Sequence, residues 1–411
     1  MTPPDDDRAP PELTLRAVDG LSGIDRDAWD LVANPPGREY DPFLSWDFLE
    51  ALEASGCVGE EAGWIPRHLL VEDGHGKLTG ALPLYAKTHS MGEYVFDHGW
   101  ADAFERAGGQ YYPKLLTAVP FSPVTGRRIL AGDPQIRRAL VAGAVQTTRQ
   151  WGLSGWHVNF PAEAEWRELS DLGLLQRMDR QFIWTNRGYA DYDAFLADLS
   201  SRKRKGLRKE RREAQAGIEI EHLTGEDLRP EHWDVFYACY QETGSRKWGY
   251  PYLNRAFFDL LHRRLADRVI LVMAKKEGRY IACALNLAGS HALYGRYWGR
   301  LDDHPFLHFE LCYHQAIDIA IERGLERVEA GAQGEHKLAR GYRPTPVYSA
   351  HFIENEGFRD AVADFLARER AAVETDIALQ DRESPFKRDT ARSLAQPSEP
   401  AKFRPGPGGI V

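Results

Sequence analysis

Cysteine is scarce in this sequence of 411 residues, and its four copies form no pattern that would hold a metal ion. No two cysteines form a CxxC pair, and none has a histidine at the spacing of a zinc site. Cys239, Cys283 and Cys312 lie in apolar segments, so we expect these three to be core residues. No such expectation is made for Cys57. Because disulfides persist in oxidising compartments, this usage favours a reducing cytoplasm.

Long apolar runs and the motif of one large enzyme class are also missing. No run approaches the roughly 20 residues that a membrane-spanning helix needs. The first residues, Met1–Asp7, are acidic and rich in proline, unlike a signal peptide. A serine hydrolase is disfavoured because the sequence has no Gly-x-Ser-x-Gly elbow. We therefore expect a cytoplasmic protein without a transmembrane segment, and nothing in the sequence indicates its oligomeric state.

Charge is distributed unevenly, because the chain has a net charge of −9 and yet one short stretch is strongly basic. Between Arg202 and Arg212, every residue except Gly206, Leu207 and Glu210 is Lys or Arg. The composition predicts a helix over 200–215 that has almost no apolar face. Like charges one turn apart repel by roughly 0.2–0.5 kcal/mol per pair, so such a helix needs anions nearby. Those anions belong either to an acidic surface of the protein itself or to an anionic ligand.

The candidate anion- or phosphate-binding residues on this helix are Arg204, Lys205 and Arg208. If a ligand supplies the anions, charge reversal at Arg204 and Arg208 weakens binding in a salt-dependent manner more than it lowers stability. If the protein's own acids supply them, the same change unfolds the chain. Both alternatives remain open from the sequence.

The chain contains two similar halves. Gly80–Leu84 aligns with Cys283–Leu287, each in the second strand of a predicted hairpin, and Gly152-Leu153 aligns with Gly324-Leu325, each between a helix and a strand. The first half carries about 31 extra residues in an irregular stretch from about 89 to 133, and loops of this length inside compact domains are often functional.

Each half has the order strand, helices, antiparallel meander, helix and closing strand pair, which is similar to the GNAT acyltransferase fold. We predict an α/β (α+β) fold of two tandem GNAT-like (acyl-CoA N-acyltransferase) domains with mixed, mainly antiparallel sheets. The first domain covers 12–190, and the second covers 191–380 and starts with the basic helix. The acidic 1–11 segment and the polar, Pro- and Gly-rich 381–411 segment are predicted to be disordered.

Several stretches resemble the FemAB-like family, which is named for peptidoglycan biosynthesis or recognition. They are Phe96–Phe104, Tyr111–Leu115, Val119–Arg128, Gly295–Gly299, His308–Tyr313 and Glu329–Gly341. The chain is more distantly similar to the Fem aminoacyl transferases, tandem GNAT-fold enzymes that move an amino acid from tRNA to a peptidoglycan precursor. That likeness rests on the basic helix, on Thr243–Lys247 and on Glu335–Gly341. The resemblance implies transfer of an acyl or aminoacyl group to an amine, with a small molecule or cell-wall precursor as acceptor.

The segment Gly331–Gly341 is the sharpest candidate site. It follows a short predicted strand, and its glycines free the backbone for close approach to a ligand. Candidate catalytic residues are Glu335 or His336 for proton handling and Lys337 for charge stabilisation, with Arg340 as a substrate-binding residue. The resemblance places Lys337 at the lysine that lies beside the donor or its phosphates in the Fem-like pattern. The alternative is an ordinary glycine-rich surface loop.

Further substrate-binding candidates come from the first half of the chain. The inserted stretch offers aromatic and polar side chains suited either to a sugar or peptide acceptor or to packing between the halves: Asp97, His98, Trp100, Tyr111 and Tyr112, together with Lys114. Nearby, Gly126 with Arg127 and Arg128 forms a candidate anion cradle.

The segment Gly295–Arg300 supplies the remaining candidates. Strand alternation puts Arg296, Trp298 and Arg300 on one face and Tyr297 on the other. Two arginines on one face of a strand need a ligand or paired carboxylates, since an unpaired buried charge is costly. The available carboxylates are Asp302, Asp303 and Glu310, and Glu310 could meet Arg296 either in a plain structural salt bridge or as part of a functional site.

The sequence makes no cofactor certain and does not name the donor, for which acyl-CoA and aminoacyl-tRNA are the candidates. GNAT enzymes hold the pyrophosphate of coenzyme A on a glycine-rich loop, but the corresponding Arg300–His308 has no glycine and contains Pro305. Two rival hypotheses stay open. One is an acetyl-CoA-dependent N-acetyltransferase that acts on a small amine, and the other is a non-catalytic protein that recognises a peptidoglycan precursor.

Overall fold

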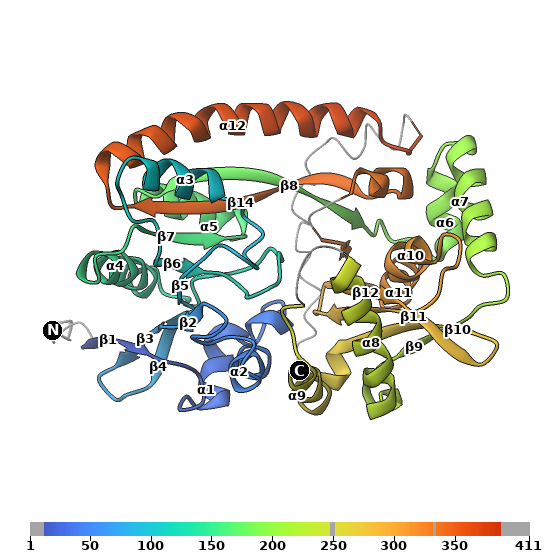
Figure 1. The fold of residues 1–411 in the computed structure, drawn as a ribbon, viewed down its shortest axis with the longest axis horizontal. Helices are drawn as coiled ribbons and strands as arrows, with labels where there is room; N and C mark the ends of the chain where they lie inside the picture. Colours follow the sequence, from blue (N-terminus) through green and yellow to red (C-terminus); the bar gives the residue numbers. More distant parts are fainter. Residues whose placement is uncertain (1–11, 247–250, 332–333, 388–411) are drawn as a thin grey trace, which may run out of the picture.

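The described residues of this computed structural model, 12–246, 251–331 and 334–387, form two similar halves that share strands (Figure 1). The elements of the first half are β1 (Leu13–Val18), α1 (Arg26–Ala33), η1 (Pro42–Leu44), α2 (Trp46–Ala54), β2 (Trp64–Pro66), β3 (His68–Asp73), β4 (Leu78–Leu82), β5 (Tyr85–Lys87), α3 (His98–Arg106), β6 (Lys114–Thr117), α4 (Pro134–Gln150), β7 (Gly155–Asn159), α5 (Glu163–Asp171) and β8 (Leu175–Thr185).

The elements of the second half are α6 (Tyr192–Asp198), α7 (Ser201–Ala214), β9 (Glu219–Leu223), η2 (Gly225–Asp227), α8 (Pro230–Arg246), α9 (Arg255–Leu265), η3 (Ala266–Arg268), β10 (Val269–Lys276), β11 (Arg279–Ala288), β12 (Ala292–Arg300), α10 (Leu307–Phe309), η4 (Glu310–His314), α11 (Gln315–Glu322), β13 (Arg327–Glu329), η5 (Glu335–Arg340), β14 (Arg343–Ile353) and α12 (Glu356–Arg382). An eleven-stranded sheet has the order β2-β5-β6-β7-β14-β8-β13-β12-β11-β10-β9, and a three-stranded sheet has the order β1-β3-β4.

The strand pairings repeat between the halves. In the first half β5 and β6 are antiparallel and β6 and β7 are parallel, and in the second half β11 with β12 and β12 with β13 show the same pattern. The connecting helices α4 and α11 are each followed by a glycine in the left-handed region, Gly152 and Gly324, which lets the chain turn back toward the sheet. These pairings confirm the predicted doubled unit and the mixed, mainly antiparallel sheets.

Two long strands are exchanged between the halves. Strand β14 completes the first-half sheet, because its residues Ser349–Ile353 pair with β7. Strand β8 completes the second-half sheet, because Ile183–Thr185 pair with β13. The two strands also pair with each other, from Arg343 opposite Ile183 to His351 opposite Leu175. A cut at the predicted boundary between residues 190 and 191 would therefore separate each of these strands from the sheet that it completes.

Two segments are more regular than the sequence predicted. The stretch of about 89–133 contains α3 and also β6, a fully buried strand that pairs with both β5 and β7. This short strand was not predicted because the aromatic, glycine and proline residues around it are typical of irregular structure. Residues 381–387 are not a disordered tail, because α12 continues to Arg382 and the buried Phe386 forms a β-bridge with Leu199. The predicted disorder of 1–11 and 388–411 lies outside the described residues.

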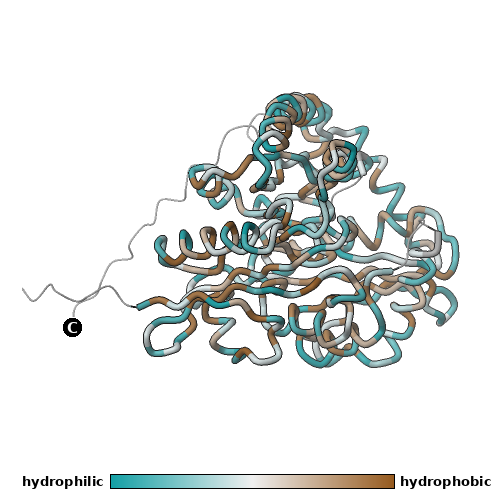
Figure 2. Tube along the Cα trace, turned by 60° about the vertical axis from the view of Figure 1, so that its left-hand side comes forward, coloured by the Kyte–Doolittle hydropathy of each residue, from teal (hydrophilic) through white to brown (hydrophobic). Residues whose placement is uncertain are grey.

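The hydrophobic core crosses from one half to the other. One cluster of buried side chains includes residues of α1 and α2 together with residues of α8 and α9. In it, Phe43 meets Tyr294 edge-on at a ring-centroid distance of 5.1 Å, and Phe48 meets Phe257 in the same way at 5.8 Å. Hydrophobic and hydrophilic residues alternate along the helices in Figure 2, as expected when a helix covers a core with one face.

Two of the three cysteines that were predicted to be core residues are buried. Cys239 and Cys283 are buried in the core as predicted, whereas Cys312 is only partly buried. Cys57, for which no burial was predicted, is buried as well, and all four cysteines are free thiols. Within the described ranges, no helix combines the length and the apolar character that crossing a membrane requires.

Gly299 on β12 lies so close to α8 that a side chain at this position would collide with backbone. A Cβ atom there would lie 2.0 Å from the carbonyl oxygen of Cys239. We expect Gly299→Ala to lower the free energy of unfolding by about 1–3 kcal/mol, the usual cost of overpacking, in urea denaturation. Gly295→Ala on the same strand is the matched control, because the nearest atom to its Cβ would be Asn286 Oδ1 at 3.5 Å. Equal losses in the two variants would contradict this packing argument.

Candidate functional site

The parallel strands β12 and β13 separate at the point where the predicted catalytic loop begins. Only Ala292–Tyr294 of β12 pair with β13, and β12 continues alone on that side to Arg300. The chain leaves β13 at Ala330 and passes through Gly331, whose φ of 79° lies in the left-handed region that glycine adopts without strain. The helical turn η5 then carries His336, Lys337 and Arg340 back beside the strand end.

Lys337 is a buried cation held by main-chain oxygens. Its side chain is 2% exposed, and its Nζ donates to the carbonyl oxygens of Ala330 at 2.7 Å and Gly331 at 2.8 Å. Burial lowers the pKa of Lys337 to about 8, so the amine is mostly protonated at neutral pH. No carboxylate among the described side chains forms an ion pair with it. Its charge is therefore compensated by main-chain carbonyl dipoles and not by a carboxylate.

His336 lies next to Lys337 with an exposed imidazole. Its Nε2 is 3.0 Å from the hydroxyl of Tyr313, which is buried on η4. Partial burial, and then the charges of Arg340 and Lys337, lower the pKa of His336 below its ordinary value, so the ring is neutral near pH 7. A neutral, accessible imidazole can accept a proton. The side chain of Glu335, the other proton-handling candidate, lies outside the described residues.

Arg340 connects η5 to the basic helix. Its Nε and Nη2 donate to the two carboxylate oxygens of Glu210 at 2.9 and 2.6 Å, and its Nη1 donates to the carbonyl of His336 at 2.7 Å. The guanidinium also lies 3.5 Å above the centroid of the Phe309 ring. Glu210 is shared with His314, whose Nε2 lies 2.9 Å away. With these contacts, Arg340 positions the loop that carries His336 and Lys337.

The basic helix α7 has one face docked on the protein and one face in solvent. On the docked face, Arg211 donates to Glu310 at 3.0 Å and to Asp318 at 2.6 Å, and Glu310 is fully buried in η4, a π-helical turn. Gln215 and Gln315 also donate to Glu310. The hypothesis that Glu310 could meet Arg296 was therefore wrong, because α7 brings the closer cation. The protein's own acids thus account for part of the basic stretch.

The three predicted anion-binding residues of α7 lie toward its outer face. Arg208 pairs with Asp193 at 2.8 Å in an exposed ion pair, and Arg204 reaches the carbonyl of Ala197 at 3.5 Å. Lys205 is exposed, and no carboxylate among the described residues pairs with it. The other exposed basic side chains of the helix are Arg202, Lys203, Lys209 and Arg212. This outer face is strongly basic and exposed to solvent, and two of its side chains, Arg208 and Lys209, pair with Asp193 and Glu213.

Arg211 and its neighbour Arg212 differ in burial and therefore in their effect on stability. We expect Arg211→Ala to lower the free energy of unfolding by roughly 3–5 kcal/mol, because the buried carboxylate of Glu310 would lose its cationic partner. Arg212→Ala, on the exposed face, is the control and should change it by less than about 0.5 kcal/mol. Urea denaturation of both variants measures the difference. Similar values would show that the helix is not anchored through Arg211.

Strand β12 does not follow the simple alternation that the sequence predicted. Its register with β11 shifts between Leu285 and Asn286, so Arg296 and Tyr297 turn to the same side. The Nη2 of Arg296 and the hydroxyl of Tyr297 both donate to the carbonyl of Phe121, at 2.9 and 3.0 Å. The prediction that Tyr297 points away from Arg296 was wrong, because one additional residue in a strand reverses the alternation beyond it.

The other two candidates of this strand also have partners within the protein. Trp298 packs against His308 with a ring-centroid distance of 4.9 Å. Arg300 forms an ion pair with Asp303, one of the three carboxylates that the sequence offered for this strand.

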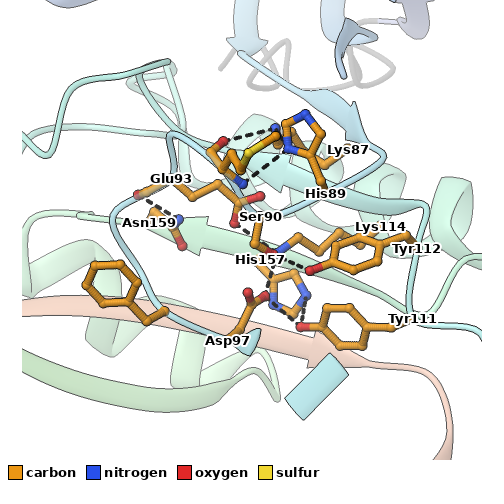
Figure 3. Close-up of polar contacts among 12 residues, drawn as sticks. Lys87, His89, Ser90, Glu93, Asp97, Tyr111, Tyr112, Lys114, His157 and Asn159 are labelled. Carbon is orange, nitrogen blue, oxygen red and sulfur yellow. Dashed lines mark hydrogen bonds and ion pairs between the residues drawn. The ribbon is translucent and has the colours of Figure 1, made fainter. Parts of the chain in front are cut away.

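The inserted segment forms a buried cluster of charged and polar groups (Figure 3). Lys114 is 0% exposed, and its Nζ donates to Glu93 and Ser90, each at 2.8 Å, and to Asp97. The hydroxyl of Tyr111 donates to Asp97 at 2.7 Å. Burial disfavours ionisation of Asp97, yet the charge of Lys114 holds the pKa of Asp97 well below its ordinary value. Burial raises the pKa of Glu93 to about 7.

The predicted acceptor-binding residues of this segment are mostly internal. Tyr112 is hydrogen-bonded to the hydroxyl of Ser90 at 2.8 Å, at the edge of the Lys114 cluster. Trp100 is buried and packs edge-on against His351 of β14 at 4.9 Å, while His98 is exposed at the start of α3. Behind them, the Nδ1 atoms of His157 and His351 lie 2.7 Å apart. The segment therefore packs against the exchanged strand β14 and does not present its aromatic side chains as an open surface.

Lys87 lies beside this cluster and is the buried lysine with the weakest compensation. Its Nζ lies 3.9 Å from the centroid of the Trp64 ring and 3.4 Å from the carbonyl of Met91. No carboxylate in the described part of the chain lies within ion-pair distance. Burial lowers the pKa of Lys87 to about 7. Neither this residue nor Glu93 stands in a recognisable motif, so sequence reasoning missed both.

Replacing Lys87 should make stability less dependent on pH. Below about pH 7 the fold holds a buried charge, and this penalty is relieved as pH rises from about 7 toward the ordinary lysine value of 10.5. We expect Lys87→Met to gain stability over the original chain, by an amount larger at pH 6 than at pH 9 by on the order of 2 kcal/mol. Urea denaturation at both pH values tests this. The exposed Lys77→Met is the control, and a pH-independent gain at Lys87 would contradict the buried charge.

The candidate anion cradle is divided between the interior and an open cavity. Arg128 is buried and donates to the main-chain oxygens of Asn159 at 2.8 Å, Arg127 at 2.9 Å and Val124 at 2.5 Å, so its donors are engaged inside the protein. Arg127 donates to the carbonyl of Ala33 and lines a cavity between the halves. Within the described ranges, no three His, Cys, Asp or Glu side chains gather as metal ligands would.

A family model described as FemAB-like, peptidoglycan biosynthesis/recognition, matches residues 20–388. No curated protein matches the sequence. The crystal structure of FemX is similar with a TM-score of 0.52 and 12% identity, covering 83% of this chain and 98% of FemX. A conserved protein of unknown function from Bacteroides thetaiotaomicron has a TM-score of 0.51 and 11% identity, covering 83% of this chain and 100% of its own.

A tandem GNAT protein from the clavulanic acid biosynthesis pathway is also similar, with a TM-score of 0.43 and 12% identity over 83% of this chain and 98% of its own. The repeated strand pattern and the likeness to FemX agree with the predicted fold of two tandem GNAT-like domains. At these identities the likenesses describe the fold alone.

Proposed function

Because this chain belongs to the FemAB-like family, we propose that it transfers an acyl or aminoacyl group to the amine of a peptidoglycan precursor. The observation that carries this proposal is that two neighbouring residues, His336 and Lys337, lie where β12 and β13 separate. One is a buried cation without a described carboxylate partner, and the other is an accessible neutral imidazole. Acyl transfer to an amine needs both kinds of group.

The two side chains have separate roles in the proposed reaction. The amine nitrogen of the acceptor attacks the carbonyl carbon of the donor, a C–N bond forms, and the carbonyl oxygen gains negative charge. Lys337 stabilises that charge or the phosphate groups of a bound substrate. The proton lost by the amine passes to His336, and it leaves with the donor's oxygen as the bond between that oxygen and the carbonyl carbon breaks.

The segment after β12 favours a donor other than acyl-CoA. A coenzyme A pyrophosphate would need free main-chain N–H groups at this helix start. Here the N–H groups of Phe309 and Glu310 already donate to the carbonyl of Phe306, at 2.9 and 3.0 Å, and that of Leu307 points to the carbonyl of His304. The exposed basic face of α7 instead suits a polyanion. We therefore propose aminoacyl-tRNA as the donor.

The direct test supplies candidate donors and acceptors to the whole protein. Charged tRNA with a UDP-linked muropeptide should give a product heavier by one amino-acid residue in mass spectrometry. Acetylation of a small amine by acetyl-CoA, without that product, would replace the proposal with the rival N-acetyltransferase. Thermal stabilisation by the muropeptide, about 2.7 kcal/mol at 100 times Kd, with no turnover from either donor would identify a recognition protein.

Lys337→Met should reduce kcat/KM of this transfer by about 10²–10³, the effect of removing one group that stabilises an oxyanion. In the original chain the rate should fall as pH rises through about 8, because Lys337 loses its proton there. The variant should lack this alkaline limb. Lys276→Met on β10 is the control and should keep both the rate and the pH profile. Full turnover by Lys337→Met would remove Lys337 from the mechanism.

A further inference from the structure

An open cavity of about 430 Å³ lies at the seam between the two halves, and no residue of the Lys337 loop lines it. The first half contributes the chain before η1, with Arg38 and Glu39, and the chain after β6, with Thr125 and Arg127. The second half contributes His291 and Arg327, which stand at the beginnings of β12 and β13. Cations from three separate segments thus surround one space.

Two of the three arginines of this cavity lack a direct ion pair with a described acid. Among the described residues, neither Arg38 nor Arg127 forms an ion pair with a carboxylate, and Arg127 has a main-chain oxygen, that of Ala33, as its acceptor. Arg327 donates through Nε to Glu329 at 2.9 Å. Two acids also line the cavity: the exposed Glu39, which lies 3.4 Å from Nε2 of His291, and the buried Asp41, whose carboxylate interacts electrostatically with Arg127 and Arg327.

Two of the lining side chains also hold buried polar atoms without a partner. Within the described part of the chain, the hydroxyl of Thr125 and the Nδ1 of His291 make no hydrogen bond. His291 is 8% exposed, so an unsatisfied ring nitrogen is costly there. Both atoms are buried, so an ordered water or a small movement of the side chain is needed before they can form hydrogen bonds.

We propose that this seam cavity binds a small phosphate-bearing molecule, with its phosphoryl group on Arg38 and Arg127. Guanidinium groups approaching from different segments suit a tetrahedral phosphate, which presents oxygens in several directions, better than a planar carboxylate. The occupant contacts both halves and so holds them in one relation. Arg327 is three residues before Ala330, which binds Lys337, so β13 places the two sites about 10 Å apart along the strand.

Isothermal titration with inorganic phosphate tests the site without any assay of activity. Each of Arg127→Gln and Arg38→Gln should weaken phosphate binding at least about tenfold, the loss expected for one charged hydrogen bond. The exposed Arg138→Gln on α4 is the control and should bind as the original chain does, with ionic strength matched by chloride. Arg38 is exposed and pairs with no described acid, so its variant tests the site even if Arg127→Gln does not fold.

Phosphate binding by Lys337→Met distinguishes the seam site from the site of the proposed transfer reaction. Lys337→Met should bind phosphate with unchanged affinity. If Lys337→Met loses binding while Arg38→Gln and Arg127→Gln retain it, phosphate occupies the Lys337 loop and the seam proposal is overturned. Binding no stronger than that of chloride in the original chain overturns it as well, and neither result contradicts the transfer activity.

Discussion

The pairing of β8 with β14 is the constraint on which the rest of the molecule depends. Each strand completes the sheet of the half that did not supply it, and nine residue pairs join them. Because a one-residue slip would turn every side chain of a strand to the opposite face, this long register fixes the two halves relative to each other. The shared core around Phe43 and Tyr294, the seam cavity and the packing of Trp100 on β14 all require that relation.

Buried charges in this fold divide into compensated and uncompensated ones. Lys114 in the first half and Arg211 in the second each meet two carboxylates, and both fix a segment against the sheet. Such pairs are costly to break because the remaining partner would be a buried charge without compensation. Lys337 is held by main-chain carbonyls and meets no described carboxylate. Lys87 also meets no described carboxylate, but it packs on the ring of Trp64, whereas Lys337 lies where β12 and β13 separate.

Much of the architecture was predictable because it is encoded locally. The hairpins, the glycines that end α4 and α11, and the repeated order of strands and helices gave the doubled α/β unit. The prediction failed at β6 and in the first residues of the assumed tail, where burial and not composition determines the structure. It also failed for Tyr297, because a single shift in register on β12 is invisible in the alternation of the sequence.

The sequence by itself determined the class of fold, the presence of a basic helix and the loop that carries His336 and Lys337, since these follow from local periodicity, charge and glycine placement. Only the tertiary structure decided which charges are satisfied. Arg340 pairs with Glu210, which is 130 positions away in the sequence, and Arg211 pairs with Glu310, which is 99 positions away. Such pairs cannot be predicted from the spacing of residues along the chain, because the exchanged strands and the packing of helices on the sheet bring them together. Whether a cation is paired with a carboxylate could therefore be decided only from the residues that surround it in the folded protein.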